Sequence, residues 1–78
     1  MTREESEKIV MSMLEKNVDG LSMSKDKMTE TLVDLGVDSL DVMLVIMDVG
    51  EKAGVAISDD QAEELETPEQ IVDFITQQ

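Results

Sequence analysis

Residues 34–47 read DLGVDSLDVMLVIM and join a helix-start signal to an uninterrupted apolar run. Either Asp38 or Ser39 is placed to cap a helix, because both residue types favour the N-cap position. The six apolar residues 42–47 would also fit a buried strand by length alone. Methionine and leucine in the run, together with the cap signal, instead predict a helix over residues 39–52.

The predicted helix carries more apolar residues than one core can cover. An apolar run of this length places side chains on every side of a helix, and a helix packed on one core buries only one face. We therefore expect some of four side chains to be exposed as an interaction surface: Leu40, Met43, Leu44 and Met47.

Three capping-box spacings mark the other helices: Thr2 with Glu5, Ser58 with Gln61, and Thr67 with Gln70. They predict a first helix over residues 2–17, a short helix ending near Leu65, and a last helix that starts at Pro68. The connection between the first and second helices is about twenty residues long, with a short helical turn at 25–28 or 29–32.

The chain of 78 residues is long enough to form one small hydrophobic core. Its only aromatic residue is Phe74, so this core must be aliphatic and rich in methionine. The sequence therefore predicts an all-α fold in a single domain over residues 1–78. It is a small four-helix bundle with three longer helices, one short third helix and a long first loop.

Charge excludes several classes of partner. Nineteen acidic residues against six basic ones give a formal charge of −13, which repels nucleic acid and anionic membrane surfaces and favours basic protein partners. No apolar run approaches the length of a membrane helix, and the first ten residues are too charged for a signal peptide. We expect a cytoplasmic monomer.

The residue inventory argues against an enzyme. Without Cys or His, the chain has no thiol chemistry, lacks the best zinc ligands, and offers a serine nucleophile no usual general base. None of the four glycines has the ligand spacing of an EF-hand loop, and the pair Asp59 and Asp60 is typical of solvated charge. We predict no metal site and no catalytic residue.

Ser39 has two interpretations. A serine at this position is most often only a helix cap. It is, however, flanked by Asp38 and Asp41, which would suit recognition by a basic enzyme, and an apolar surface is expected beside it. A chain without chemistry of its own but with a marked partner surface would suit a carrier that receives its reactive group from another enzyme.

At this point the sequence resembles the acyl carrier protein family. The motif LGVDSLD at residues 35–41, the ISDD turn at 57–60 and the TPEQIVDFI ending at 67–75 all match it, and the resemblance covers nearly the whole chain. It implies the bundle of acyl-carrier type, with 4′-phosphopantetheine joined to Ser39 through a phosphodiester by a transferase that uses coenzyme A and magnesium. Acyl groups would then be held as thioesters.

The resemblance also implies partner enzymes. They would be acyl-loading, condensing and tailoring enzymes of fatty acid, polyketide or related biosynthesis, with basic docking patches. By position, six residues would face these partners: Asp38, Leu40, Asp41, Met43, Met47 and Glu51. Core packing is an equal alternative for Met43, and Asp48 is expected to be a plain solvated charge.

Three positions depart from the pattern of fatty-acid carriers. Leu44 and Gly50 stand where glutamates are usual, and Ala53 stands where a phenylalanine is usual. The first two would weaken an acidic docking stripe, and the third would remove a large core side chain. The departures favour a specialised carrier, and they leave open an aminoacyl or peptidyl carrier or an unmodified acidic interaction domain.

Overall fold

The computed structural model describes all residues 1–78 and contains only helices, turns and connections. The elements are α1 (Arg3–Asn17), the 3-10 helix η1 (Lys25–Thr29), α2 (Ser39–Ala53), α3 (Asp59–Glu63) and α4 (Pro68–Thr76). The predicted all-α fold, with three longer helices, a short third helix and a long first connection, is confirmed. Of the two predicted positions for the helical turn, the structure has the first.

The predicted capping boxes all form, at the start of α1, α3 and α4. In each, a Ser or Thr hydroxyl accepts a hydrogen bond from the backbone N–H of the residue three positions later. The Glu or Gln side chain of that later residue accepts a hydrogen bond from the backbone N–H of the Ser or Thr. These bonds satisfy backbone donors that a helix leaves free at its first turn. The helix starts are therefore specified by residues no more than three positions apart.

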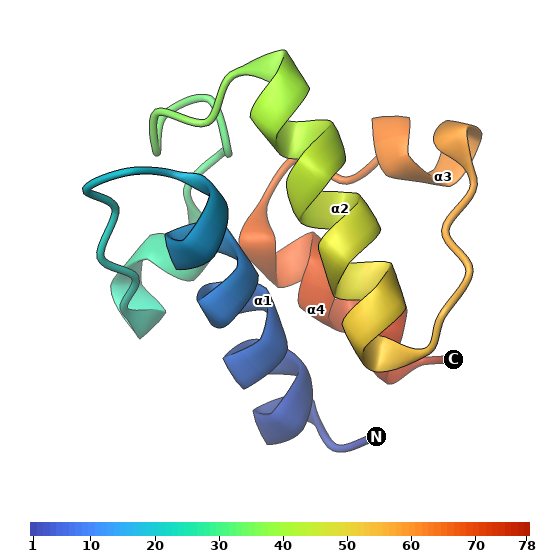
Figure 1. The fold of residues 1–78 in the computed structure, drawn as a ribbon. Coiled ribbons are helices and arrows are strands. Elements are labelled where there is room, and N and C mark those ends of the chain that lie inside the picture. Colours follow the sequence, from blue (N-terminus) through green and yellow to red (C-terminus); the bar gives the residue numbers. More distant parts are fainter.

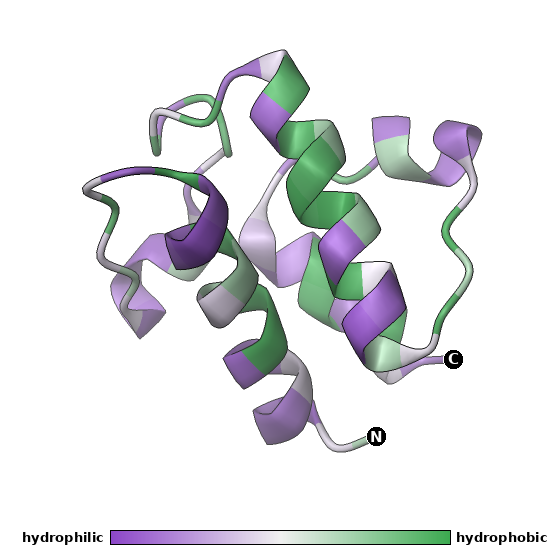
Figure 2. Ribbon diagram, viewed as in Figure 1, coloured by the Kyte–Doolittle hydropathy of each residue, from purple (hydrophilic) through white to green (hydrophobic).

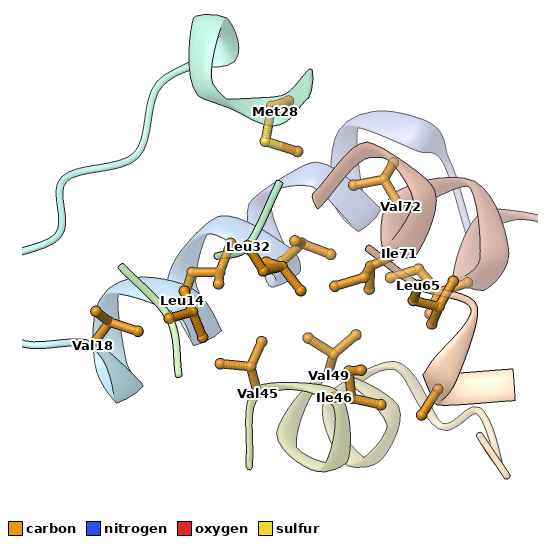
Figure 3. Close-up of a cluster of buried hydrophobic side chains, with 14 residues drawn as sticks. Leu14, Val18, Met28, Leu32, Val45, Ile46, Val49, Leu65, Ile71 and Val72 are labelled. Atoms are coloured by element: carbon orange, nitrogen blue, oxygen red, sulfur yellow. The ribbon is translucent and has the colours of Figure 1, made fainter. Parts of the chain in front are cut away.

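The core lies where α1, α2 and α4 meet (Figure 1). Figure 3 shows Val45, Ile46 and Val49 of α2 facing Leu14 of α1 and Ile71 of α4. Fourteen buried side chains form this cluster, all of them aliphatic or methionine. The expected aliphatic core is confirmed, and the single aromatic residue only packs against its edge. Burial of such side chains contributes about 1.5–3 kcal/mol each.

Polar contacts join the two ends of the chain. The Thr76 hydroxyl donates to the hydroxyl of Ser6, which is fully buried and donates in turn to the Thr2 carbonyl. Beside them, the Arg3 guanidinium forms ion pairs with Glu69 and Asp73 of α4. These contacts hold the start of α1 against α4, at the end of the bundle opposite to the start of α2 (Figure 1).

The long connection between α1 and α2 is anchored to the rest of the fold. Met28 in η1 and Leu32 after it are buried in the core, and Figure 3 shows Met28 above Val72 of α4. The Glu15 carboxylate accepts the Met23 backbone N–H at 2.8 Å. Because its apolar side chains are anchored at several places, this connection can hold the start of α2 in a defined place.

No helix of the structure is long and apolar enough to span a bilayer.

Candidate functional site

Ser39 is the first residue of α2, and Asp38 is its N-cap. The Asp38 carboxylate accepts the backbone N–H of Asp41 at 2.8 Å, and its carbonyl accepts that of Val42 at 2.9 Å. The interpretation of Ser39 as the helix cap is therefore wrong. The Ser39 side chain is exposed, and its hydroxyl takes part in none of the side-chain hydrogen bonds around the helix start. A free, accessible hydroxyl is thus presented at the end of a helix.

The cap assignment makes a prediction about stability. Replacing Asp38 with alanine removes the bond to the first turn of α2 and should lower the free energy of unfolding by about 0.5–2 kcal/mol. Asp38→Asn keeps an acceptor of equal capping strength and should stay within about 0.5 kcal/mol of wild type. Urea denaturation followed by circular dichroism measures both. Equal losses in the two variants would contradict a capping role for Asp38.

The segment before Ser39 is held by a compact turn. The Leu32 backbone N–H donates to the Glu66 carbonyl at 2.9 Å, and the Val37 N–H donates to the Leu32 carbonyl at 3.0 Å. Both side chains are buried. Gly36 has φ +87°, a value that favours glycine, and this lets the chain reverse between the two anchors. The backbone next to Ser39 is therefore fixed by one hydrogen bond within the turn and one to the link before α4.

A groove runs from Ser39 between α2 and α3. A hollow of about 340 Å³ lies beside Ser39, lined by Val33, Val42 and Leu65 among others. A second hollow of about 210 Å³ continues toward Ile57. Met43 and Ala62 line both hollows, which therefore adjoin, and we call the two together the α2–α3 groove. The walls beside Ser39 are largely apolar and suit an aliphatic chain better than a polar one, whereas Glu51 and Asp59 add polar surface to the second hollow.

The apolar run of α2 is divided between core and surface. Val45 and Val49 are fully buried and Ile46 is 3% exposed, whereas Leu40 is 70% and Met47 65% exposed. Met43 and Leu44 are exposed at 40% and 43%, so the expectation of exposed residues in this run is confirmed for all four. Figure 2 shows the hydrophobic colour through the middle of α2, with hydrophilic residues toward its two ends.

The predicted site residues come together on one side of α2. Because each residue turns the helix by about 100°, Leu40, Leu44 and Met47 fall on one stripe; we call these three residues the apolar ridge. Ser39 is next to its first residue, and the exposed Glu51 follows its last. Met43 lies between the ridge and the α2–α3 groove, so the alternative of core packing for Met43 is wrong.

Carboxylates border the apolar ridge. Asp38 lies at its start, Glu51 at its end, and the half-buried Asp41 beside its first turn. Asp59 and Glu63, which were not predicted site residues, line the groove side. Val33 was also missed and is 78% exposed beside Ser39. It belongs to a connection without periodic pattern, so no sequence signal places it there.

Gly50 does not belong to the exposed surface. It is buried, and a Cβ on it would lie 2.8 Å from the Val55 carbonyl oxygen and 3.4 Å from the Ile57 side chain. The interpretation of Gly50 as a gap in an acidic docking stripe is therefore wrong, because the backbone of the next connection packs on this position. Ala53 is half-buried against the core and lines neither hollow, so it does not enlarge the α2–α3 groove.

The prediction that Asp48 is a plain solvated charge is wrong. Its carboxylate accepts a hydrogen bond of 3.0 Å from the Asn17 side-chain amide and lies 3.5 Å from Lys16 Nζ. The Asn17 bond, helped by the positive charge of Lys16, lowers the pKa of Asp48 below its usual value. These contacts join the end of α1 to the middle of α2, beside the exposed surface.

The lowered pKa of Asp48 predicts a pH dependence. The carboxylate of Asp48 should contribute its full stabilisation above about pH 3.9, the usual pKa of an aspartate in an unfolded chain. This contribution should be lost as the pH falls through the lower pKa of the folded state. Asp48→Asn resembles the protonated acid, so wild type should be the more stable protein at neutral pH and the difference should narrow in acid. Urea denaturation across an acidic pH series measures this. A difference that stays constant would contradict it.

No group of three or more acidic side chains in the structure is arranged to hold a metal ion. The acidic pair Asp59 and Asp60 lies exposed in the first turn of α3. What the site offers chemically is one accessible hydroxyl, an apolar groove beside it and an apolar ridge with an acidic border.

Comparison with known proteins gives a consistent result. A family model described as the phosphopantetheine attachment site matches residues 10–75. An acyl carrier protein of Exiguobacterium sibiricum is 49% identical over 45 residues, which cover 58% of this chain and 57% of that protein. An acyl carrier protein of Helicobacter pylori is 42% identical over 59 residues, which cover 76% of this chain and 73% of that protein.

A solved structure has the same fold. It is the solution structure of the acetyl actinorhodin acyl carrier protein from Streptomyces coelicolor, which superposes with a TM-score of 0.70 at 27% sequence identity. The superposition covers 99% of this chain and 88% of that chain. The likeness therefore extends over the three longer helices, the short third helix and the long first connection.

Proposed function

This chain belongs to the acyl carrier protein family, and from that premise we propose that Ser39 is the residue to which its 4′-phosphopantetheine is attached. The observation that carries this proposal is the Ser39 hydroxyl, exposed at the start of α2 and not engaged in the helix cap. Such a hydroxyl can form a phosphodiester without breaking a bond that the fold needs. The attached group supplies a terminal thiol, which holds acyl groups as thioesters and which this Cys-free chain otherwise lacks.

The chain's own residues present and shelter the attachment point. Asp38 fixes the first turn of α2, so the backbone that carries Ser39 has a defined position for an incoming enzyme. The phosphodiester forms as the Ser39 oxygen replaces adenosine 3′,5′-bisphosphate on the phosphorus of coenzyme A, with loss of the hydroxyl proton. This chain has no His, Cys or Tyr to take that proton, and we assign the base to the modifying transferase, which uses coenzyme A and magnesium. Catalysis belongs to partner enzymes, and residues 1–78 act as one carrier domain. A tethered cargo then has a high effective concentration at the docked active site.

The partners and cargo follow from the same surface. We propose that acyl-loading, condensing and tailoring enzymes, with basic residues around their docking sites, bind the side of α2 next to Ser39, and that the carrier works as a cytoplasmic monomer. The largely apolar hollow beside Ser39 supports an acyl cargo over an aminoacyl one. Leu44, in place of the usual glutamate, and the similarity to the actinorhodin carrier support a specialised member, as in polyketide biosynthesis.

The test is direct modification of the wild-type protein. It is incubated with coenzyme A, magnesium and a broad-specificity phosphopantetheinyl transferase, and the intact mass is measured. We expect one phosphopantetheine per chain, located by fragment masses on Ser39. No added mass, or an addition on another residue, would overturn the assignment. Loading of the modified protein by an amino-acid-adenylating enzyme, with no loading by acyltransferases, would replace the acyl cargo by an aminoacyl one.

A further inference from the structure

Methionine is the only type of side chain in this sequence that mild oxidants attack. The sequence has seven methionines and no Cys, His, Trp or Tyr, and peroxides convert the thioether of an accessible methionine to a sulfoxide. We propose that Met43 and Met47 form a reversible oxidation site, and that their sulfoxides slow the attachment of phosphopantetheine to Ser39 while the protein stays folded. The proposal rests on the proposed function, because this attachment is the step that oxidation slows.

Solvent exposure divides the methionines into two groups. Met47 is 65% and Met43 40% exposed, whereas Met28 is 5% exposed and belongs to the core cluster. Three others are partly buried against the same cluster: Met11, Met13 and Met23. Apart from Met1 at the start of the chain, the exposed thioethers are therefore the two on α2. A peroxide in solution reaches this pair before it reaches the core.

The two exposed thioethers lie at one place in the fold. Met43 and Met47 are four positions apart, so their side chains are neighbours on one side of α2, and both line the second hollow of the α2–α3 groove. Met43 also lines the hollow beside Ser39, and Met47 is the last residue of the apolar ridge. Oxidation of the pair therefore changes the surface next to the attachment hydroxyl.

The chemical step needs only a peroxide. The thioether sulfur attacks one oxygen of hydrogen peroxide, and an S–O bond forms as the O–O bond breaks. The proton of the transferred oxygen passes to the departing hydroxide, which leaves as water; the sulfur loses two electrons and the peroxide gains them. Methionine sulfoxide reductases catalyse the return to the thioether, in which a dithiol is oxidised to a disulfide and the oxygen leaves as water.

The sulfoxide changes an apolar surface into one that is costly to cover. Its oxygen accepts hydrogen bonds, and in the free protein water supplies them, so the fold loses little. A transferase that covers this side of α2 must remove that water, and residues 42–47 have no polar side chain that could replace it. The polar side chains of the second hollow are Glu51 and Asp59, whose carboxylates cannot donate to the sulfoxide oxygen. Burial of the oxidised pair is therefore disfavoured.

The experiment compares wild type with two double variants before and after oxidation. Met43→Leu with Met47→Leu removes the proposed site, and Met11→Leu with Met23→Leu removes the same number of thioethers outside it. Each protein is treated with dilute hydrogen peroxide, and the peroxide is removed. The kcat/KM of the transferase reaction with coenzyme A is then compared with that of the same protein before treatment. Peptide masses locate the sulfoxides, and circular dichroism establishes that each protein is folded.

Wild type and the control variant should gain sulfoxides at Met43 and Met47 before Met28. Both should then lose about ten-fold in kcat/KM, as expected for a polar group buried without a partner. The variant with leucine at positions 43 and 47 should retain the value that it has before treatment, because it has no sulfur at the site. Reductases for both sulfoxide epimers, supplied with dithiothreitol, should restore the rate of oxidised wild type.

Three results would overturn the inference. The first is an equal loss in wild type and in the Met43→Leu, Met47→Leu variant, which would place the damage at another residue. The second is an oxidised wild type that is modified at its original rate. The third is a loss that coincides with a sulfoxide at Met28 and a reduced helical signal, which would assign it to unfolding. If untreated wild type gains no phosphopantetheine, the proposed function fails, and the inference fails with it.

Discussion

Ser39→Ala should gain no phosphopantetheine under conditions that fully modify the wild-type protein. The substitution removes the only hydroxyl at the start of α2, and no other side chain there can form the phosphodiester. Because Asp38 holds the helix cap, the free energy of unfolding should stay within about 0.5 kcal/mol of wild type. Intact mass after transferase treatment measures the first result, and urea denaturation followed by circular dichroism measures the second.

Ser58→Ala is the matched control for this prediction. Ser58 is also followed by acidic residues, but its hydroxyl accepts the Gln61 backbone N–H and caps α3. Its loss should leave modification complete and lower the free energy of unfolding by about 0.5–2 kcal/mol. The two serines should therefore separate attachment from capping. Modification of Ser39→Ala, or its loss in Ser58→Ala, would contradict the assignment of the attachment residue.

Gly50→Glu should lower the free energy of unfolding by about 1–3 kcal/mol, because its side chain is crowded against the connection that packs on this position. The first side-chain carbon would lie 2.8 Å from the Val55 carbonyl oxygen, which is backbone and cannot rotate away. A chain of this size has a thin margin of stability, so much of the variant should be unfolded at room temperature. Circular dichroism in a urea series measures the loss.

Two further variants isolate the cause. Gly50→Ala adds only the crowding carbon; because alanine also favours the helix by about 1 kcal/mol, its net loss should be smaller than that of Gly50→Glu. Ala56→Glu places the same charge on an exposed residue of the connection that packs on Gly50, and it should stay near wild type. A stable Gly50→Glu protein would mean that the segment from Val55 to Ile57 can move off α2.

A movement of the segment from Val55 to Ile57 away from α2 would also change the α2–α3 groove. Val55 and Ile57 line the second hollow together with Gly50, so a side chain at position 50 changes the wall of the α2–α3 groove as well as the stability of the protein. The absence of a side chain there is therefore a requirement of the packing. It is not a missing docking charge, as its place in the sequence had indicated.

Local patterns were sufficient to predict the helices. Capping boxes and proline at a helix start act over a few residues, so their meaning does not depend on the rest of the chain. The proposal that Ser39 is the attachment residue instead rests on a resemblance that covers nearly the whole chain. The same local rules could not choose between Asp38 and Ser39 as the cap of α2. Both residue types favour the N-cap position. The backbone geometry that places Asp38 there is set by the turn from Leu32 to Val37.

Long-range contacts account for what the sequence left open. The uniformly apolar run of α2 has no internal preference for one face, and burial of Val45 and Val49 over Leu40 and Met47 is set where α1 and α4 pack against it. Asp48 finds Asn17 only because α1 lies beside α2. The helix starts are thus determined by short-range chemistry, while the apolar ridge, the groove and the buried Gly50 arise from contacts between residues distant in the chain.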